Sequence, residues 1–185
     1  RVHRMTTDIL EHLRYPIGRF TAPAAYTPEM IAECIGRIAA FPTQLETTVQ
    51  HLNDAQLDTP YRPDGWTVRQ VVHHCADSHV NSYIRFRWAL TEEGPTIKAY
   101  FEERWAELPD ARTMPVTPSL ALLHGLHARW AALLSSLSTA QQQRAFIHPE
   151  SGSAISLQVA MATYAWHGEH HRMQIVRLLE RKGWA

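Results

Sequence analysis

Apolar side chains recur every three or four residues along four long segments of the chain, a spacing typical of amphipathic helices. The first segment begins at Thr27-Pro28-Glu29, where a hydroxyl cap precedes a proline at the first helical position, and continues to about Leu52. Pro42 lies inside this segment and predicts a kink, because proline has no backbone N–H to donate to the preceding turn.

Three further segments show the same helical periodicity. The helix predicted over residues 67–92 begins with capping-box spacing between Thr67 and Gln70. The next, over residues 117–137, begins with another Thr-Pro pair, and the last, over residues 156–182, ends in basic residues followed by a glycine. Four helices of this length and amphipathicity favour an all-α fold.

The remaining chain predicts the connections. Residues 96–118 contain several prolines and indicate a long crossover, whereas residues 144–157 place a Pro-Glu-Ser-Gly turn between short apolar runs, typical of a β-hairpin. We expect an antiparallel four-helix bundle with one long crossover and a short hairpin before the last helix. Residues 1–26 are predicted to be an N-terminal extension, and residues 27–185 the bundle domain.

Composition narrows the classes of protein that fit. Across 185 residues, 18 basic side chains balance 18 acidic ones, so no basic surplus is available to bind nucleic acid. No apolar run is long enough to cross a membrane. The only cysteines, Cys34 and Cys75, form no paired framework, which suits a reducing compartment, and we expect a cytoplasmic protein that acts on a small molecule.

Histidine is over-represented, with 12 residues, and it clusters. In the last predicted helix, His167 and His171 are four positions apart, so their imidazoles lie on one face about 6 Å apart along the axis. Such a pair can bind one metal ion, but a site that activates water normally takes three protein ligands. A third ligand must therefore come from another helix.

Two other predicted helices offer that third ligand. In the second helix, His74 lies at the edge of the apolar stripe, and His73 is rotated by about 100° from it. Helix periodicity favours His74 only slightly. His124 and His127 in the third helix are rival ligands, or polar groups that support the ligands from behind.

Other metal and phosphate motifs are absent. The chain has no HExxH pair, and the cysteines of a zinc deaminase do not follow His167-Gly168-Glu169. A di-iron bundle would need Glu-x-x-His pairs, but Arg172 stands three positions after Glu169. No glycine-rich phosphate loop or GxSxG motif occurs.

Several stretches carry a resemblance to a known family. The block from Leu57 to His79, the early Tyr15-Pro16-Ile17-Gly18, the segment Asn81–Phe86 and the closing histidine-rich helix are similar to YfiT-type proteins of the DinB-like superfamily. The similarity extends over nearly the whole chain from Tyr15 onward. Members are four-helix bundles that bind zinc or nickel through three histidines.

The resemblance implies a ligand set and an activity. It implies that His74, His167 and His171 bind one divalent metal per subunit, with zinc first and nickel second, in a homodimeric metal-dependent hydrolase. The roles of the neighbouring histidines stay open; these are His73, His79, His127 and His170. Cys75, where we expect an aliphatic residue, is predicted to pack as an apolar side chain.

Two other functions fit a three-histidine site. Relatives in the superfamily include S-transferases that use bacillithiol or mycothiol, because a metal that activates water also activates a thiol. Such cofactors need a cationic rim, for which Arg85, Arg129 and Arg172 are candidates, although each is more often a surface residue. A metal-stabilised stress-response module without turnover is the third interpretation, and a fourth protein ligand such as His170 would favour it.

Asp77 is the remaining candidate residue. It lies one turn after His74 and close to its face, so we expect it either to orient a ligand or to lie near the open metal position. The three tryptophans nearest the histidines are more often core residues than walls of a substrate site; these are Trp66, Trp130 and Trp166.

Overall fold

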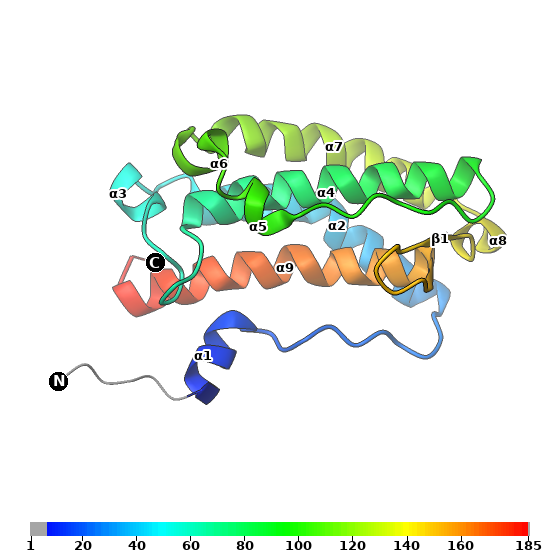
Figure 1. Ribbon diagram of the computed structural model, residues 1–185, viewed down its shortest axis with the longest axis horizontal. Helices are drawn as coiled ribbons and strands as arrows, with labels where there is room; N and C mark the ends of the chain where they lie inside the picture. The colour runs from blue at the N-terminus through cyan, green and yellow to red at the C-terminus, as the bar shows by residue number, and fades with distance from the viewer. Residues whose placement is uncertain (1–6, 185) are drawn as a thin grey trace.

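The computed structural model describes residues 7–184, and four long helices form its body (Figure 1). They are α2 (Pro28–Val49), α4 (Val68–Thr91), α7 (Thr117–Ser135) and α9 (Leu157–Lys182). The four-helix bundle and the helix limits predicted from periodicity are confirmed to within a few residues.

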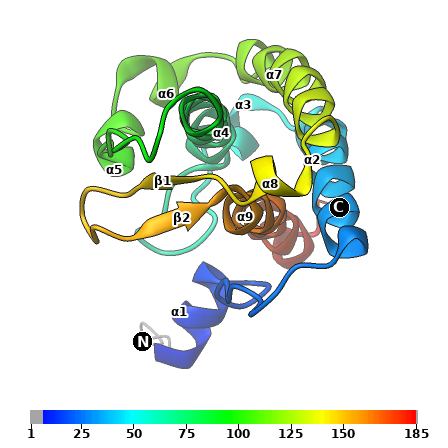
Figure 2. The ribbon, with the colours of Figure 1, turned by 90° about the vertical axis from the view of Figure 1, so that its right-hand side faces the viewer.

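The crossover between α4 and α7 sets the directions of the helices. Figure 1 shows α4 and α7 running one way and α2 and α9 running the other, and Figure 2 shows the four arranged as a ring. Within this ring α2 packs on both α7 and α9, and α4 packs on the same two helices. The pairs α4–α9 and α2–α7 are therefore antiparallel, whereas α4–α7 and α2–α9 are parallel.

Short elements fill the connections. The predicted hairpin is present, with β1 paired antiparallel to β2 and Phe146 opposite Ile155. The crossover pairs with this hairpin through Thr96, and it holds two short helices that the sequence pattern did not indicate. The short elements are α1 (Thr7–Arg14), α3 (Asp54–Leu57), α5 (Glu102–Trp105), α6 (Pro109–Thr113), α8 (Thr139–Gln142), β1 (Ala145–Ile147) and β2 (Ala154–Ser156).

Side-chain caps define the starts of five helices in the described part of the chain. Thr67 and Gln70 form the predicted capping box at the start of α4, and Thr27 caps α2. The same role expected of Thr117 is wrong, because Val116 occupies the capping position of α7 and Thr117 is already helical. Gly183 ends α9 with φ of 66°, a left-handed conformation that glycine adopts without steric cost.

The interior is divided into two apolar clusters. On α4, the first cluster contains several residues of the range Val68–Ala76, and the second contains Tyr83, Phe86 and Ala89. On α9, the clusters lie at Leu157–Ala165 and Ile175–Leu179. His79 on α4 and the histidines of α9 fall between the two clusters, whereas His73 and His74 lie within the stretch of α4 that belongs to the first cluster.

The N-terminal part of the described chain lies against the bundle. Helix α1 contacts α9, and Gln174 donates a hydrogen bond to the Arg14 carbonyl across 2.9 Å. Part of the predicted extension 1–26 is thus attached to the last helix; residues 1–6 lie outside the described range. Within residues 7–184, no helix combines the length and apolar character needed to cross a membrane.

Candidate metal centre

The start of α4 holds His74 in place through buried polar contacts. The Arg69 side chain, 4% exposed, forms ion pairs with Asp54 and Asp58 and so joins α4 to α3 and the turn after it. Gln70 donates a hydrogen bond to the Ala106 carbonyl in the crossover. These contacts fix the position of His74 one turn further along the helix.

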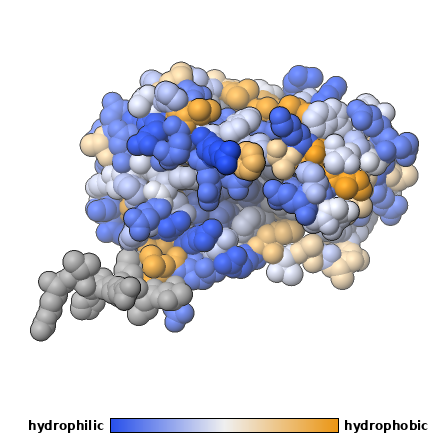
Figure 3. All heavy atoms as spheres, viewed as in Figure 1, coloured by the Kyte–Doolittle hydropathy of each residue, from blue (hydrophilic) through white to orange (hydrophobic). Residues whose placement is uncertain are grey.

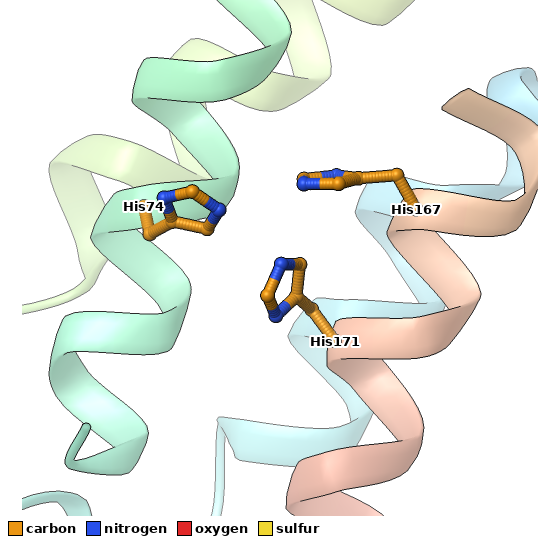
Figure 4. Close-up of side chains that lie close together, drawn as sticks. All are labelled: His74, His167 and His171. Atoms are coloured by element: carbon orange, nitrogen blue, oxygen red, sulfur yellow. The ribbon is translucent and has the colours of Figure 1, made fainter. Parts of the chain in front are cut away.

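His74 on α4 and the pair His167 and His171 on α9 lie together between the two helices, as Figure 4 shows. Ring centroids are 5.4 Å apart for His74 and His167, 4.7 Å for His74 and His171, and 4.5 Å for the α9 pair. One nitrogen from each ring lies within 4.8 Å of the other two. Two metal–nitrogen bonds of about 2.1 Å at a tetrahedral angle place their nitrogens about 3.4 Å apart, so modest rotations of the rings bring three nitrogens to one ion.

Burial keeps all three rings neutral. Desolvation lowers the pKa of His74 and His167 well below 6.5, and it lowers the pKa of His171 to about 4. Repulsion between the neighbouring rings, were they charged, lowers the pKa of His74 and His167 further. Each ring therefore has an unprotonated nitrogen at neutral pH, which metal binding requires.

Hydrogen bonds support the two candidate ligands on α9 from behind. His171 Nδ1 donates to Gln174 Oε1 across 2.9 Å, because the Gln174 amide nitrogen is committed to the Arg14 carbonyl. His167 Nδ1 is 3.0 Å from His79 Nε2. The His74 ring has no such bond among the described residues and packs on the Trp66 ring at 4.7 Å. Both candidate ligands on α9 thus leave Nε2 for the shared space.

A cavity of about 860 Å³ opens next to the three histidines. Figure 3 shows a hollow in this face with hydrophilic residues around much of its rim. Its volume suits a small-molecule ligand, and its wall carries both signs of charge. The charged residues of the wall are Arg14, Arg62, Arg85, Asp64, Glu102, Glu103, Glu107 and Glu150.

Comparison with known proteins agrees with this geometry. The family model of the DinB superfamily matches residues 37–175. The chain belongs to the DinB superfamily. Two relatives, from Bacillus mycoides and Geobacillus thermodenitrificans, are each named as a "Putative metal-dependent hydrolase". They share 53% and 49% sequence identity with this chain. Each alignment covers 95% of this chain, and covers 100% and 98% of the relative's own length, respectively.

A solved structure extends the comparison to the fold. The structure is that of YfiT from Bacillus subtilis, described as "a probable metal-dependent hydrolase with an unusual four-helix bundle topology". It is 47% identical, covers 94% of this chain and 99% of its own, and superposes with a TM-score of 0.92. Membership of the DinB superfamily and the resemblance to YfiT-type proteins are therefore confirmed.

The DinB-superfamily match includes every histidine discussed above, and the structure separates their environments. The rival ligand His73 bonds to Ser119 Oγ on α7 and to the Met114 carbonyl at the end of α6. His124 pairs with Glu46 near the surface. His127 is buried and bonds to His79, away from the cavity. The nitrogens that converge are those of His74, His167 and His171.

The other candidate residues of this DinB-superfamily chain lie at varying distances from the site. Arg85 lines the cavity, whereas Arg172 pairs with Glu169 and Arg129 lies over the Tyr83 ring. Cys75 is completely buried, and its burial raises the pKa of the thiol, which fits the predicted apolar packing. Trp66 lines the cavity, Trp130 is a core residue, and Trp166 stacks on His170.

Asp77 forms no hydrogen bond or ion pair with the three histidines among the described residues. Its side chain neither lines the cavity nor hydrogen-bonds to a ring among the described residues. Desolvation, with a smaller contribution from Asp110, raises its pKa to about 6. The predicted role in orienting a ligand therefore stays a prediction, without a hydrogen bond to support it.

Sequence reasoning missed the residues that support the candidate ligands on α9. Gln174 lies three positions after His171, so helical spacing alone places the two side chains on the same face of α9. Its second partner, Arg14, is 160 residues away in the chain. Arg14 and Tyr15 form part of the cavity wall, and they lie outside the DinB-superfamily match. The similarity at Tyr15-Pro16-Ile17-Gly18 was the one signal that pointed to this segment.

Proposed function

We propose that this protein is a metal-dependent hydrolase in which His74, His167 and His171 hold one divalent ion. The observation that carries the proposal is the convergence of three neutral imidazoles, two of them oriented by hydrogen bonds, at the wall of a cavity. His170 is not one of the converging residues, since its Nε2 contacts the Gln174 amide. This arrangement supports an ion with an open position.

Three neutral ligands leave the full charge of a divalent ion available, and such an ion lowers the pKa of a bound water to about 7. The chain's own residues hold and orient the other participants. Arg85 at the cavity wall is suited to an anionic group of a substrate, while Trp66 covers one side of the His74 ring. Imidazole ligands suit both zinc and nickel, and we propose zinc as the first candidate and nickel as the second.

Metal content tests the ligand set. The protein, purified without an affinity metal and dialysed against zinc or nickel, is expected to retain one ion per chain by plasma mass spectrometry. The variant His171→Ala is expected to retain far less. His124→Ala is a matched control, because His124 bonds to Glu46 and faces away from the cavity. Stoichiometric metal in His171→Ala would contradict the assignment.

Turnover tests the reaction class. Metal-loaded protein is offered activated esters and amides over a range of pH. We expect hydrolysis whose rate rises with an apparent pKa near 7 and needs no added thiol. Full metal loading without turnover of any of these substrates would overturn the hydrolase proposal.

The second candidate is a thiol S-transferase, with bacillithiol as the co-substrate. The cavity of about 860 Å³ supports it, because the volume accommodates a thiol cofactor together with an electrophile and three arginines line the wall. The metal-loaded protein is offered bacillithiol and an epoxide or halogenated electrophile. A rate that saturates in thiol and vanishes without it favours the transferase. Failure of both substrate sets favours a non-catalytic metal-binding module.

Homodimer formation is proposed as well. Four large apolar side chains are exposed on the crossover and the helices within it: Phe101, Trp105, Leu108 and Met114. A second copy of the chain would cover them. Sedimentation velocity at micromolar concentration is expected to show a species of twice 21.1 kDa, and a 21.1 kDa species alone would contradict a stable dimer.

A further inference from the structure

Three hydrogen bonds, two of them fully buried, connect His167 to the backbone of α2. His167 Nδ1 is 3.0 Å from His79 Nε2, and His79 Nδ1 is 2.8 Å from His127 Nε2. His127 Nδ1 is 2.6 Å from the Ile38 carbonyl oxygen. His79 and His127 are 0% and 1% exposed, so water does not compete for these bonds. We call His79 and His127 the interior histidine pair.

Pro42 explains why the Ile38 carbonyl accepts from a side chain. In a regular helix, the carbonyl of residue 38 accepts from the backbone N–H of residue 42. Pro42 lies inside α2 and has no N–H, so this helical bond is missing. His127 on the neighbouring helix α7 supplies the missing donor.

The carbonyl fixes the direction of every bond in the series, because it can only accept. His127 must therefore have its proton on Nδ1, which leaves Nε2 as an acceptor. Desolvation lowers the pKa of His127 to about 4, so its ring carries a single proton at neutral pH. His79 must then donate from Nδ1 and accept at Nε2, and His167 must donate from Nδ1.

We propose that the interior histidine pair, anchored at the carbonyl that Pro42 leaves free, fixes the tautomer of His167 so that its Nε2 lone pair faces His74 and His171. His79 and His127 are positioning residues in this proposal, which rests on the proposed function only in assigning a metal to that lone pair. With the reverse tautomer, the nitrogen that faces the other two ligands would carry a proton and could not bind an ion.

The surroundings of the interior histidine pair hold the rings still. The Phe41 ring lies 5.0 Å from the His79 ring and 5.6 Å from the His127 ring, and Trp130 meets both rings edge-on. The series ends at a backbone carbonyl, which cannot release a proton to solvent. The arrangement therefore suits a fixed orientation of His167 rather than proton transfer out of the cavity.

The first experiment reads the tautomer directly in metal-free protein. Nitrogen NMR of isotope-labelled histidine rings at neutral pH distinguishes a protonated from an unprotonated ring nitrogen. We expect His167, His79 and His127 all to be protonated at Nδ1 and unprotonated at Nε2. A proton on Nε2 of His167 would overturn the proposal, and this result requires neither metal nor activity.

Two variants of His127 separate positioning from packing. His127→Phe keeps a ring but removes both bonds, and we expect His167 to become a mixture of tautomers. His127→Gln keeps a donor and an acceptor on either side of one carbon, as imidazole does, and is expected to restore the wild-type tautomer. His73→Phe is the matched control, because His73 is also buried with two hydrogen bonds but bonds to Ser119 and Met114. It should leave the tautomer of His167 unchanged.

Metal affinity gives the second readout, measured by competition with a chromophoric chelator. We expect His127→Phe and His79→Phe to weaken zinc binding by about 10- to 100-fold, and His127→Gln to bind within a few-fold of wild type. An unchanged tautomer and affinity in His127→Phe would overturn the proposal. If wild-type protein binds no metal but shows the expected tautomers, the proposed function fails and the fixed tautomer stands.

Discussion

His167 and His171 lie one turn apart on the same helix, yet different regions of the molecule support them. Behind His167 is the interior histidine pair, which is dry and ends at the backbone of α2. Behind His171 is Gln174, whose amide also bonds to the Arg14 carbonyl at the end of α1. We call the second region the N-terminal contact.

The difference predicts how each ligand responds to disturbance. The interior histidine pair lies between the two apolar clusters, so its bonds open only when the bundle itself opens. The N-terminal contact depends on the short helix α1, which packs mainly on α9. Movement of α1 would loosen His171 while leaving His167 oriented. The predictions below test this contrast, beginning with the largest expected effect.

Acid should destabilise the metal-free protein through both regions. Burial lowers the pKa of His127 and His171 to about 4, and that of His170 to about 3. The unfolded rings titrate near 6.5, so the unfolded state binds more protons as the pH falls from about 6.5 to about 4. Each ring then removes about 1.4 kcal/mol of the free energy of unfolding per pH unit, and several kcal/mol are lost in total.

Urea unfolding in the presence of a chelator, repeated over this pH range, measures the loss. His127→Phe should make the pH dependence shallower because it removes one titrating ring. Gln174→Leu should not, because every ring remains. Stability that does not change between neutral pH and about pH 5 would contradict the assignment of neutral buried histidines.

Gln174→Leu should affect the N-terminal contact alone. It leaves the His171 Nδ1–H and the Arg14 carbonyl without their partners, and we expect zinc affinity to fall about 10- to 100-fold. Hydrogen exchange should accelerate in residues 8–20 and stay slow in α4. Gln44→Leu, at an exposed position of α2, is the control. Unchanged exchange in residues 8–20 would show that Gln174 does not hold α1.

Gly168→Ala should disturb the packing around the interior histidine pair. A Cβ at this position would lie 2.7 Å from Phe41 Cδ2, so the ring that packs on His79 and His127 must shift. We expect a loss of about 1–3 kcal/mol in the free energy of unfolding. Gly125→Ala on α7 meets nothing within 4 Å and should instead stabilise by up to about 1 kcal/mol. Equal effects of the two substitutions would contradict the close approach of α9 to Phe41.

Asp77→Asn should have the smallest effect. The pKa of Asp77, raised to about 6, means that its folded form holds the proton more tightly than its unfolded form. Stability from this group is present at low pH and lost as the pH rises to about 6, so the variant should gain up to about 1 kcal/mol at neutral pH after allowance for solvent screening. No gain is expected near pH 4.

The same variant tests the sequence-based role of Asp77. If the carboxylate orients a metal ligand, zinc affinity falls about 10- to 100-fold in Asp77→Asn. Unchanged affinity together with the gain in stability would leave Asp77 as a half-buried carboxylate with no role at the site.

Local sequence signals were sufficient for the helices but not for the choice among the histidines. Caps and periodicity located α2, α4 and α9 because these signals lie within each helix. Residues 68–76 are all buried, so the apolar stripe of α4 has no clear edge there, and periodicity favoured His74 over His73 only slightly. The choice came from the family resemblance.

Long-range partners were beyond the reach of the sequence. Gln174 and Arg14 are far apart in the chain, and no periodicity links them. Pro42 was visible as a break in helical bonding, but the donor that would meet the free Ile38 carbonyl depends on how α7 packs on α2. The two short helices of the crossover were missed because their few residues give too little periodicity to detect.

Pro42 has a consequence for attempts to engineer this protein. A designer seeking thermostability would replace a proline in the middle of a helix, expecting a gain of up to about 3 kcal/mol. In Pro42→Ala, the restored backbone N–H would compete with His127 for the Ile38 carbonyl. Helix α2 would gain stability, but His167, which is linked to His127 through His79, would lose part of its fixed orientation. A routine stabilising substitution would thus trade thermostability against metal affinity.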